Sequence, residues 1–278
     1  MTEQSAELVL PEAQCPQGFV PNAGASGYYR ASLKSSAVRE LLNQSELTGP
    51  ERVGVIDDAA ALVTAGQLEP AIVLEQVEAL VALNQIPITK STLRIVSSLD
   101  RHLITDDVRP QYEAFIRATY GPLAEKMGFD AKEGETEEEA LLRPRLLSIV
   151  GDVGRDPHIR EEARRRLPEI LNSGSGVAPE ALSTTVQLAA LDGDMELYRE
   201  LRSALNDITD PRLRKAVLSA IGSISDPRAV EESLNWVIEK DLPLSERGSL
   251  LSPPFSSPET LPVAWEFLRS NLDELAGT

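Results

Sequence analysis

The sequence predicts an all-α protein in which antiparallel helix pairs stack in a row as an α-solenoid, with one short β-strand before the first helix. Three observations favour this fold class. Aromatic residues make up only 4% of the chain, while Leu, Ala, Glu and Arg, which suit helices, are abundant. Apolar residues recur at helical spacing from Ser36 onward, and Pro and Gly divide them into short stretches. The unequal spacing of these breaks leaves a compact, non-repeating helical bundle as the alternative architecture.

The N-terminal region, 1–35, is predicted to be a β-strand remnant or linker, distinct from a helical body at 36–278. Prolines and glycines interrupt it repeatedly. Residues 27–33 (GYYRASL) predict one short strand, because they are partly aromatic and show little helical periodicity. A lone strand is marginal in water, so we expect it to pair with itself, with the helical body or with a sheet outside this chain.

In the first half of the body, Pro marks the predicted helix starts and Gly marks several ends. Proline suits the first helical turn, because the N–H that it lacks would have no partner there. The predicted starts are Pro50, Pro70 and Pro87, with a fourth at Asp107. The helix that starts at Pro50 is predicted to end before Gly66, and the helix that starts at Asp107 before Gly128. The acidic run at 133–139 is predicted to be an exposed loop that becomes a helix N-terminus, with an interaction patch as the alternative.

In the second half, an Asp-Pro pair recurs as a predicted helix start. An Asp carboxylate at the N-cap accepts a bond from a free backbone N–H, and Pro fits the next position. The pairs are Asp156-Pro157, Asp210-Pro211 and Asp226-Pro227, with Ser257-Pro258 as a fourth variant and further starts at Ala178-Pro179 and Gly193-Asp194.

Charge and composition narrow the partners that this chain is expected to have. The formal net charge is −17, which repels nucleic acid and anionic membrane surfaces, so we expect neither as a partner. An acidic cavity that attracts cationic peptides is an alternative to a plain solvated acidic surface.

The cysteine content and the N-terminal residues bear on disulfides, zinc sites and cellular location. The single cysteine, Cys15, rules out an internal disulfide and any zinc site that needs several cysteines. No signal peptide is apparent at the acidic N-terminus, which favours a cytoplasmic location, although the compartment of a longer parent would decide it.

No motif for catalysis appears in the sequence. The two histidines, His102 and His158, do not belong to a His-Glu-x-x-His zinc motif and are expected near a helix end and on an exposed first turn. No serine lies in a Gly-x-Ser-x-Gly elbow. Asp57 and Asp58 point about 100° apart on a helix, so they do not form a shared-proton dyad. We therefore expect no metal, no cofactor and no enzymatic activity in this chain alone.

Residues 20–30 (VPNAGASGYYR) carry the first part of a family resemblance. They are similar to the Asn-x-Gly-x-x-Gly-Tyr-Tyr-Arg signature of the aminopeptidase N family of zinc metallopeptidases, and match it at Asn22, Gly24, Gly27, Tyr28, Tyr29 and Arg30. Residues 51–59 resemble the family's Arg-x-x-Leu-Ile-Asp-Asp-Ala-Phe helix through Arg52, Asp57 and Asp58, although Ala60 replaces the usual Phe. Residues 62–68 match its continuation.

Three later stretches extend the resemblance in the same order along the chain. Residues 120–129 and 141–157 resemble the family's Tyr-x-x-Leu-Gly-Trp and Leu-Leu-Arg…Gly-Asp-Pro regions, the second through Arg143. Residues 263–275 resemble Ala-Trp-x-Phe-Leu-x-x-Asn-Trp-Asp-x-Leu through Trp265, with Leu272 in place of the second Trp. The chain is thus similar to the endoplasmic-reticulum-aminopeptidase-like C-terminal helical domain of that family.

The resemblance implies a function for the chain. It implies HEAT-like helix pairs, truncated at the C-terminal end, that form a wall over the active site, gate it and contact the peptide. The partners implied are the parent's own catalytic domain, which holds the zinc, and the peptide substrate. A stand-alone HEAT-like scaffold for protein partners is the alternative, and an independent hydrolase is a third hypothesis.

Three arginines in the matched motifs are the candidate peptide or interdomain contacts: Arg30, Arg52 and Arg143. A structural salt bridge or cap, with acidic partners such as Asp57 or Asp58, is the alternative for each. We expect Tyr28 and Tyr29 to pack within the strand, and Trp265 with Phe267 to fill the interior.

Overall fold

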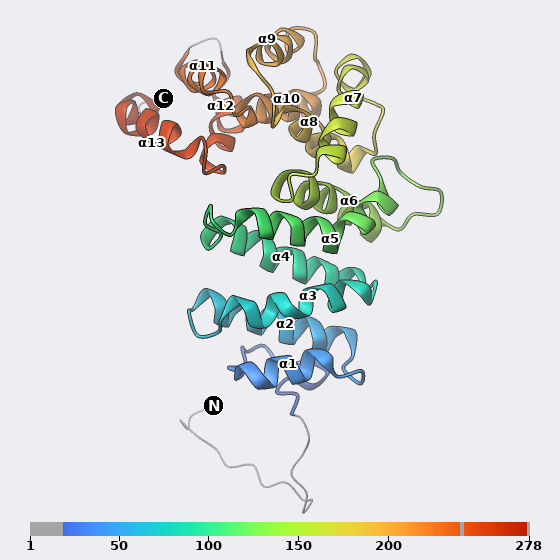
Figure 1. Cartoon of the computed structure of the whole chain (residues 1–278). Coiled ribbons are helices and arrows are strands. Elements are labelled where there is room, and N and C mark those ends of the chain that lie inside the picture. Colours follow the sequence, from blue (N-terminus) through green and yellow to red (C-terminus); the bar gives the residue numbers. More distant parts are fainter. Residues whose placement is uncertain (1–18, 240–241, 277–278) are drawn as a thin grey trace, which may run out of the picture. The chain divides into compact units, whose positions relative to one another are not determined.

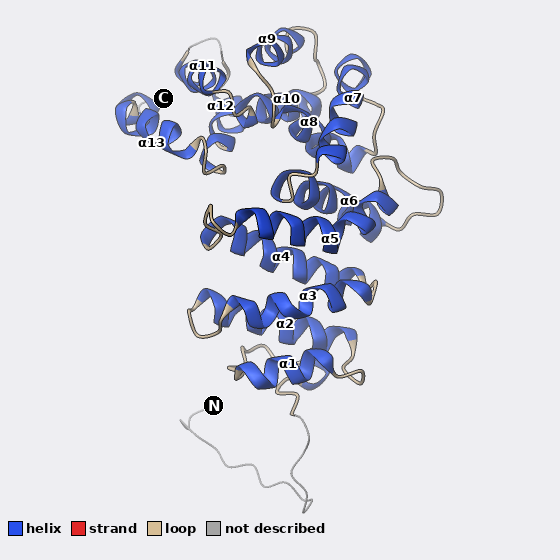
Figure 2. Ribbon diagram, viewed as in Figure 1, coloured by secondary structure: helices blue, strands red, loops and turns tan. Residues whose placement is uncertain are grey.

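The computed structural model describes residues 19–239 and 242–276, and these are helical apart from turns and loops (Figures 1 and 2). The helical class is therefore confirmed for this part of the chain. Two compact units divide it, Met1–Thr92 and Leu93–Thr278, and the division falls inside helix α4 (Ile86–His102). The stacked, HEAT-like arrangement and the boundary at 35/36 remain predictions.

The first unit contains a small helical core. Its elements are η1 (Ala23–Ala25), α1 (Ser35–Asn43), α2 (Gly49–Thr64), α3 (Pro70–Ala82) and the beginning of α4. Helix α1 packs against both α2 and α3, and Val38, Ile56 and Val73 are fully buried. A capping box starts α2, since the Thr48 side chain accepts from the Glu51 N–H and the Glu51 side chain accepts from the Thr48 N–H.

The second unit contains the remaining helices. They are α5 (Arg109–Met127), α6 (Glu137–Ser148), η2 (Ile149–Val153), α7 (Pro157–Ser173), η3 (Pro179–Ala181), α8 (Leu182–Ala190), α9 (Met195–Ala204), α10 (Pro211–Ser223), α11 (Pro227–Ile238), α12 (Leu244–Leu251), η4 (Pro253–Phe255), α13 (Leu261–Ser270) and α14 (Leu272–Ala276). Helix α8 packs extensively against α7 and α10, and α10 also packs against α12. The short π-helix η2 contacts α5, α6 and α7, which places it at the junction of three helices.

The predicted Asp-Pro starts are confirmed. Asp156, Asp210 and Asp226 are the N-caps of α7, α10 and α11, and each carboxylate accepts a backbone N–H of the first turn at 2.7–3.0 Å. Asp194 caps α9 in the same way. The Ser257-Pro258 variant is wrong, because α13 begins at Leu261 after Thr260, and the Ser257 hydroxyl bonds Glu259 instead.

The predicted strand at 27–33 is wrong. Within the described residues 19–34 the chain forms the short η1 turn followed by irregular extended backbone, with no strand. A strand needs a neighbour to satisfy its backbone groups, and no described residue provides one. Tyr28 and Tyr29 therefore do not pack within a strand, and both side chains are exposed. Residues 1–18 of the predicted remnant lie outside the described residues.

In the described part of the chain, no helix is both long enough and apolar enough to span a bilayer.

Candidate functional site

The first matched motif forms a closed loop that is anchored on α2. The Asn22 side chain donates to the Gly27 carbonyl at 2.9 Å and accepts from the Gly27 N–H at 2.8 Å. Gly24 adopts a left-handed φ of 66° that suits glycine, and its N–H donates to the Glu51 carboxylate at 2.7 Å. Hydrogen bonds to Gly24 and Thr48 lower the pKa of Glu51. These motif residues thus fix the path of the backbone.

Asp58 fastens the end of the same loop. It is buried and accepts the Ala31 N–H at 3.1 Å and the Arg30 guanidinium at 3.4 Å. The Arg30 side chain remains 64% exposed. Asp57, the adjacent carboxylate, is half-buried. Among the three candidate arginines, Arg30 is therefore the one with a solvent-facing side chain.

Arg52 and Arg143 are buried and bind backbone carbonyls. Arg52 donates to the Leu42 and Gln44 carbonyls at 2.5 and 2.7 Å. Arg143, which is fully buried, donates to the Met127 and Gly128 carbonyls at 2.6 and 2.9 Å and pairs with Glu135. This geometry favours the structural alternative for both residues. A peptide or interdomain role for any of the three arginines remains a prediction.

The prediction that Trp265 fills the interior is wrong, because its side chain is 60% exposed. Residues 264 and 267 instead face the core, where Ala264 is buried with Val230 and Leu234, and Phe267 packs against them. Adjacent helical positions point about 100° apart, so Trp265 is turned away from the face that Ala264 buries.

The two histidines lie where the sequence places them. His102 is the last residue of α4, and His158 is exposed in the first turn of α7. In the part of the chain that the structure describes, His, Cys, Asp and Glu side chains form no group of three or more that could hold a metal ion.

A cavity of about 550 Å³ in the second unit is lined by α4, α6, η2 and α8. We call it the basic pocket. It is defined by Arg94, Arg101 and Arg145, together with the hydroxyl-bearing residues Ser97, Ser98, Ser148 and Thr184 and the apolar Leu93, Pro144, Ile149 and Val153. The described lining residues include no carboxylate. Guanidinium and hydroxyl donors around one cavity suit an anion such as a carboxylate.

Sequence reasoning missed the basic pocket. Arg94 and Arg101 are seven residues apart on α4, which puts them on one helix face. That spacing was available as a signal. Arg145 comes from a different helix, so its position beside them depends on tertiary packing.

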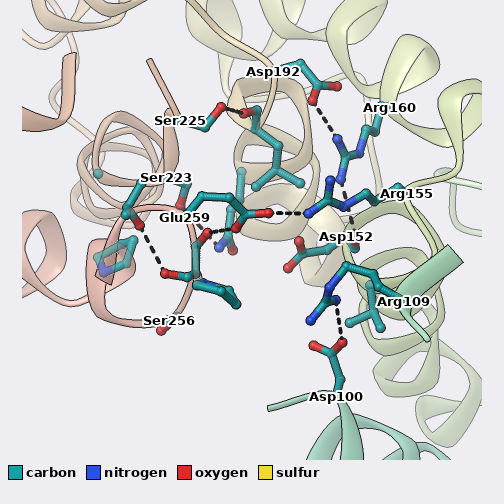
Figure 3. Close-up of a pocket in the computed structure, with 18 residues that line it drawn as sticks. Asp100, Arg109, Asp152, Arg155, Arg160, Asp192, Ser223, Ser225, Ser256 and Glu259 are labelled. Carbon is teal, nitrogen blue, oxygen red and sulfur yellow. Dashed lines mark hydrogen bonds and ion pairs between the residues drawn. The ribbon is translucent and has the colours of Figure 1, made fainter. Parts of the chain in front are cut away.

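A second cavity of about 240 Å³ is lined in part by Asp152 and Val153 of η2, and we call it the paired-charge pocket (Figure 3). It is defined by Asp100, Arg109, Asp152, Arg155, Arg160, Asp192, Ser223, Ser225, Glu259 and Thr260. Figure 3 draws the three arginines on one side and Glu259, Ser223 and Ser256 opposite them. Four carboxylates thus share this cavity with three guanidiniums.

Asp152 is the carboxylate of this pocket whose pKa is raised, whereas the pKa of Glu259 is lowered. Burial raises its pKa, and the nearby guanidinium of Arg160 opposes that rise only in part. A carboxyl group with a raised pKa in a cavity is a frequent mark of a functional site.

The fold and the pockets together define a class of protein: an all-helical domain with two charged cavities and, in its described residues, no metal-binding cluster. Residues 19–278 match the family described as the ERAP1-like C-terminal domain, and the chain belongs to this family. The resemblance to the C-terminal helical domain of an aminopeptidase is thereby confirmed.

Plant aminopeptidases are among the similar curated proteins. Aminopeptidase M1 of Arabidopsis thaliana is 24% identical over 271 residues, which cover 92% of this chain and 30% of that protein. Aminopeptidase M1-D of Oryza sativa subsp. japonica is 26% identical over 275 residues, with the same coverage of each chain. The chain spans less than a third of the length of these relatives.

Proposed function

We propose that this chain is the non-catalytic helical part of a zinc aminopeptidase, where it covers the catalytic domain, gates access and contacts the peptide substrate. The observation that carries the proposal is the family match over 19–278, joined to relatives named as aminopeptidases of which the chain spans 30%. The relatives' remaining length provides room for a catalytic domain as partner.

The basic pocket supports the peptide contact. A peptide carries a terminal carboxylate at the end farthest from the residue that an aminopeptidase removes. Arg94, Arg101 and Arg145 offer planar guanidinium groups that can bind a carboxylate through two parallel hydrogen bonds. Because the whole chain carries a formal charge of −17, a cavity lined by arginines and hydroxyls is a local exception that directs an anion to one place.

In the proposed parent, a separate catalytic domain holds the zinc, which needs about three protein ligands beside an open position. The role that we propose for this chain is to bind and position the peptide, and we derive no chemical step from it.

Peptide binding to the purified chain tests the proposal. A decapeptide with a fluorophore at its N-terminus is titrated with the chain at low ionic strength, once with a free C-terminal carboxylate and once as the amide. Fluorescence anisotropy reports binding. We expect the free acid to bind about tenfold more tightly than the amide, as fits the loss of one charge-assisted contact.

Variants locate the contact. Arg94→Ala/Arg145→Ala should remove the preference for the free acid, whereas Arg199→Ala/Lys215→Ala should keep it. The control pair removes the same charge from exposed positions outside the pocket. Equal binding of acid and amide by the unaltered chain would contradict the peptide contact, and equal loss in both variants would contradict the pocket.

The stand-alone scaffold is the second candidate, and the surrounding reading frame separates the two. A His-Glu-x-x-His motif followed by Glu upstream in the same frame supports the aminopeptidase. A complete frame that lacks this motif supports the scaffold.

A further inference from the structure

We propose that the paired-charge pocket binds a compact organic cation, a primary ammonium or a guanidinium group, through the Asp152 carboxylate. The ligand is opposite in charge to the one proposed for the basic pocket. The proposal stands without the peptide contact, since it rests on different charged residues and a different cavity.

The ion pairs of the pocket involve all three arginines but only three of its four carboxylates. Arg109 pairs with Asp100 at 3.0 Å, and Arg160 pairs with Asp192 at 2.6 Å. Arg155 pairs with Glu259, and its Nε also lies 3.3 Å from Glu113. Each guanidinium of the lining therefore has its own carboxylate.

Asp152 is the remaining carboxylate. Its backbone carbonyl accepts from Arg160 at 3.2 Å, but its side chain accepts no hydrogen bond from the described residues. A carboxylate without a partner costs free energy when it loses water. A ligand that carries N–H donors and a positive charge would remove that cost, whereas an anion would add to it.

The hydroxyl groups of the wall also favour a donor ligand. The Ser223 hydroxyl donates to the Ser219 carbonyl at 2.8 Å, and the Ser225 hydroxyl donates to the Leu191 carbonyl at 3.0 Å. Thr260 donates to the Pro254 carbonyl at 2.8 Å. The hydrogens of these three hydroxyls are engaged, so each can act toward a ligand only as an acceptor, and the Ser223 oxygen already accepts from the Gln187 side chain at 3.3 Å.

Asp152 lies in the π-helix η2 and lines the cavity from there. Its wide turn is closed by the bond from the Gly154 N–H to the Ile149 carbonyl at 2.8 Å, five residues apart. A turn of this kind inserts an extra residue into a helix and often occurs at functional sites. Arg155 follows in a left-handed conformation, with a φ of 46°, a backbone state that is costly for a residue other than glycine.

The size of the pocket limits its occupant. A cavity of about 240 Å³ is smaller than the roughly 300–1,000 Å³ of drug-sized ligand sites. One basic side chain or a small free amine suits it better than a whole cofactor. The same chemistry can thus come from a lysine or arginine of a peptide or from a free amine.

Small cations test the pocket directly. Isothermal titration calorimetry measures binding of n-butylammonium and methylguanidinium to the full chain, with tetramethylammonium as a cation that lacks N–H donors. We expect saturable binding of the first two and at least about tenfold weaker binding of the third. Absence of saturable binding by both donors overturns the proposal.

The Asp152→Asn variant locates the site. It removes the charge but keeps the shape, and it should weaken binding of both donor cations at least about tenfold. Glu180→Gln, at an exposed carboxylate outside the pocket, should leave binding unchanged. Equal affinity of the Asp152→Asn variant and the unaltered chain overturns the proposal.

The pH profile of the unaltered chain gives a second readout that needs no variant. Burial raises the pKa of Asp152, and Arg160, Asp100, Arg155 and Glu259 are the charged groups that act on it. Because the cation binds the ionised carboxylate, its affinity should rise with pH and level off above the pKa of Asp152. Affinity that stays constant from pH 4 to pH 8 overturns the proposal.

Two further probes distinguish the sources. An acetylated, amidated peptide with one lysine is compared with the same peptide carrying norleucine, and spermidine serves as the free amine. Lysine-dependent peptide binding that is lost in Asp152→Asn supports a peptide side chain as occupant, and binding of spermidine alone supports a free amine. The carboxylate-free peptide keeps this test separate from the one for the basic pocket.

Discussion

The basic pocket and the paired-charge pocket share the π-helix η2 yet differ in the carboxylates that line them. Each pocket is lined by three arginines, and Val153 lines both. In the paired-charge pocket every arginine forms an ion pair with a carboxylate other than that of Asp152. In the basic pocket the described lining includes no carboxylate. The two pockets thus contain the same number of arginines, and the ligands proposed for them differ in charge because the carboxylates of the two linings differ.

The largest change in stability is expected for Arg143, which lies near the basic pocket but does not line it. Arg143 and Arg145 are two residues apart on α6, but Arg143 is fully buried and Arg145 is exposed. Arg143→Ala should lower the free energy of unfolding by about 3–5 kcal/mol, because it leaves the half-buried Glu135 and two carbonyls without their donor. Urea-induced unfolding followed by circular dichroism measures the change.

Arg145→Ala is the matched control. An exposed substitution should change the free energy of unfolding by no more than about 0.5 kcal/mol. Similar losses for the two variants would show that the basic pocket is part of the structural framework, and the comparison between the pockets would fail.

A smaller change in the free energy of unfolding is expected when the Asp152 carboxylate is replaced. Since burial raises the pKa of Asp152, the folded state binds its proton more tightly than the unfolded state. Stability contributed by this group is therefore complete below the ordinary Asp pKa of about 3.9 and falls as the pH rises through the raised value. Asp152→Asn should increase the free energy of unfolding at pH 7 by about 1 kcal/mol, the scale of one unpaired polar group.

Urea unfolding of the Asp152→Asn variant at several pH values checks the sign. The gain should shrink as the pH falls and vanish below about pH 3.9. A variant that is less stable than the unaltered chain at pH 7 would show that Asp152 is already well paired.

The smallest effect is expected for the ion pair between Arg155 and Glu259, which joins segments that are 104 residues apart. The two side chains are 44% and 49% exposed, and pairs of this kind contribute little because water and salt screen them. Glu259→Gln should lower the free energy of unfolding by less than about 1 kcal/mol, and less still at high salt. Thermal melts at two salt concentrations measure it, and a loss of several kcal/mol would contradict the estimate.

Local signals in the sequence predicted the helices well. Asp156, Asp210 and Asp226 cap helices because the cap needs only a carboxylate and the next few N–H groups. The capping box at Thr136 and Glu139 likewise begins α6 within the predicted acidic run. Such features involve neighbours in the chain and can be predicted from the sequence.

Features that depend on tertiary packing were predicted poorly. Trp265 has the composition of a core residue but lies on the outer face of α13, and nothing in its own helix determines which face is covered. The strand predicted at 27–33 has suitable residues but no neighbouring strand among the described ones. Asp152 lines a cavity from within a π-helix, which has no recognised sequence signal here.

The central claim is that this chain binds peptide without cleaving it. The most direct test is to incubate the chain, with zinc added, with a peptide that has a free carboxylate. Mass spectrometry of the peptide recovered with the chain reads out both properties in one sample. We predict that the peptide is retained and keeps its full mass. Stepwise loss of N-terminal residues by an activity that co-purifies with the chain, or no retention of the peptide, would contradict this account.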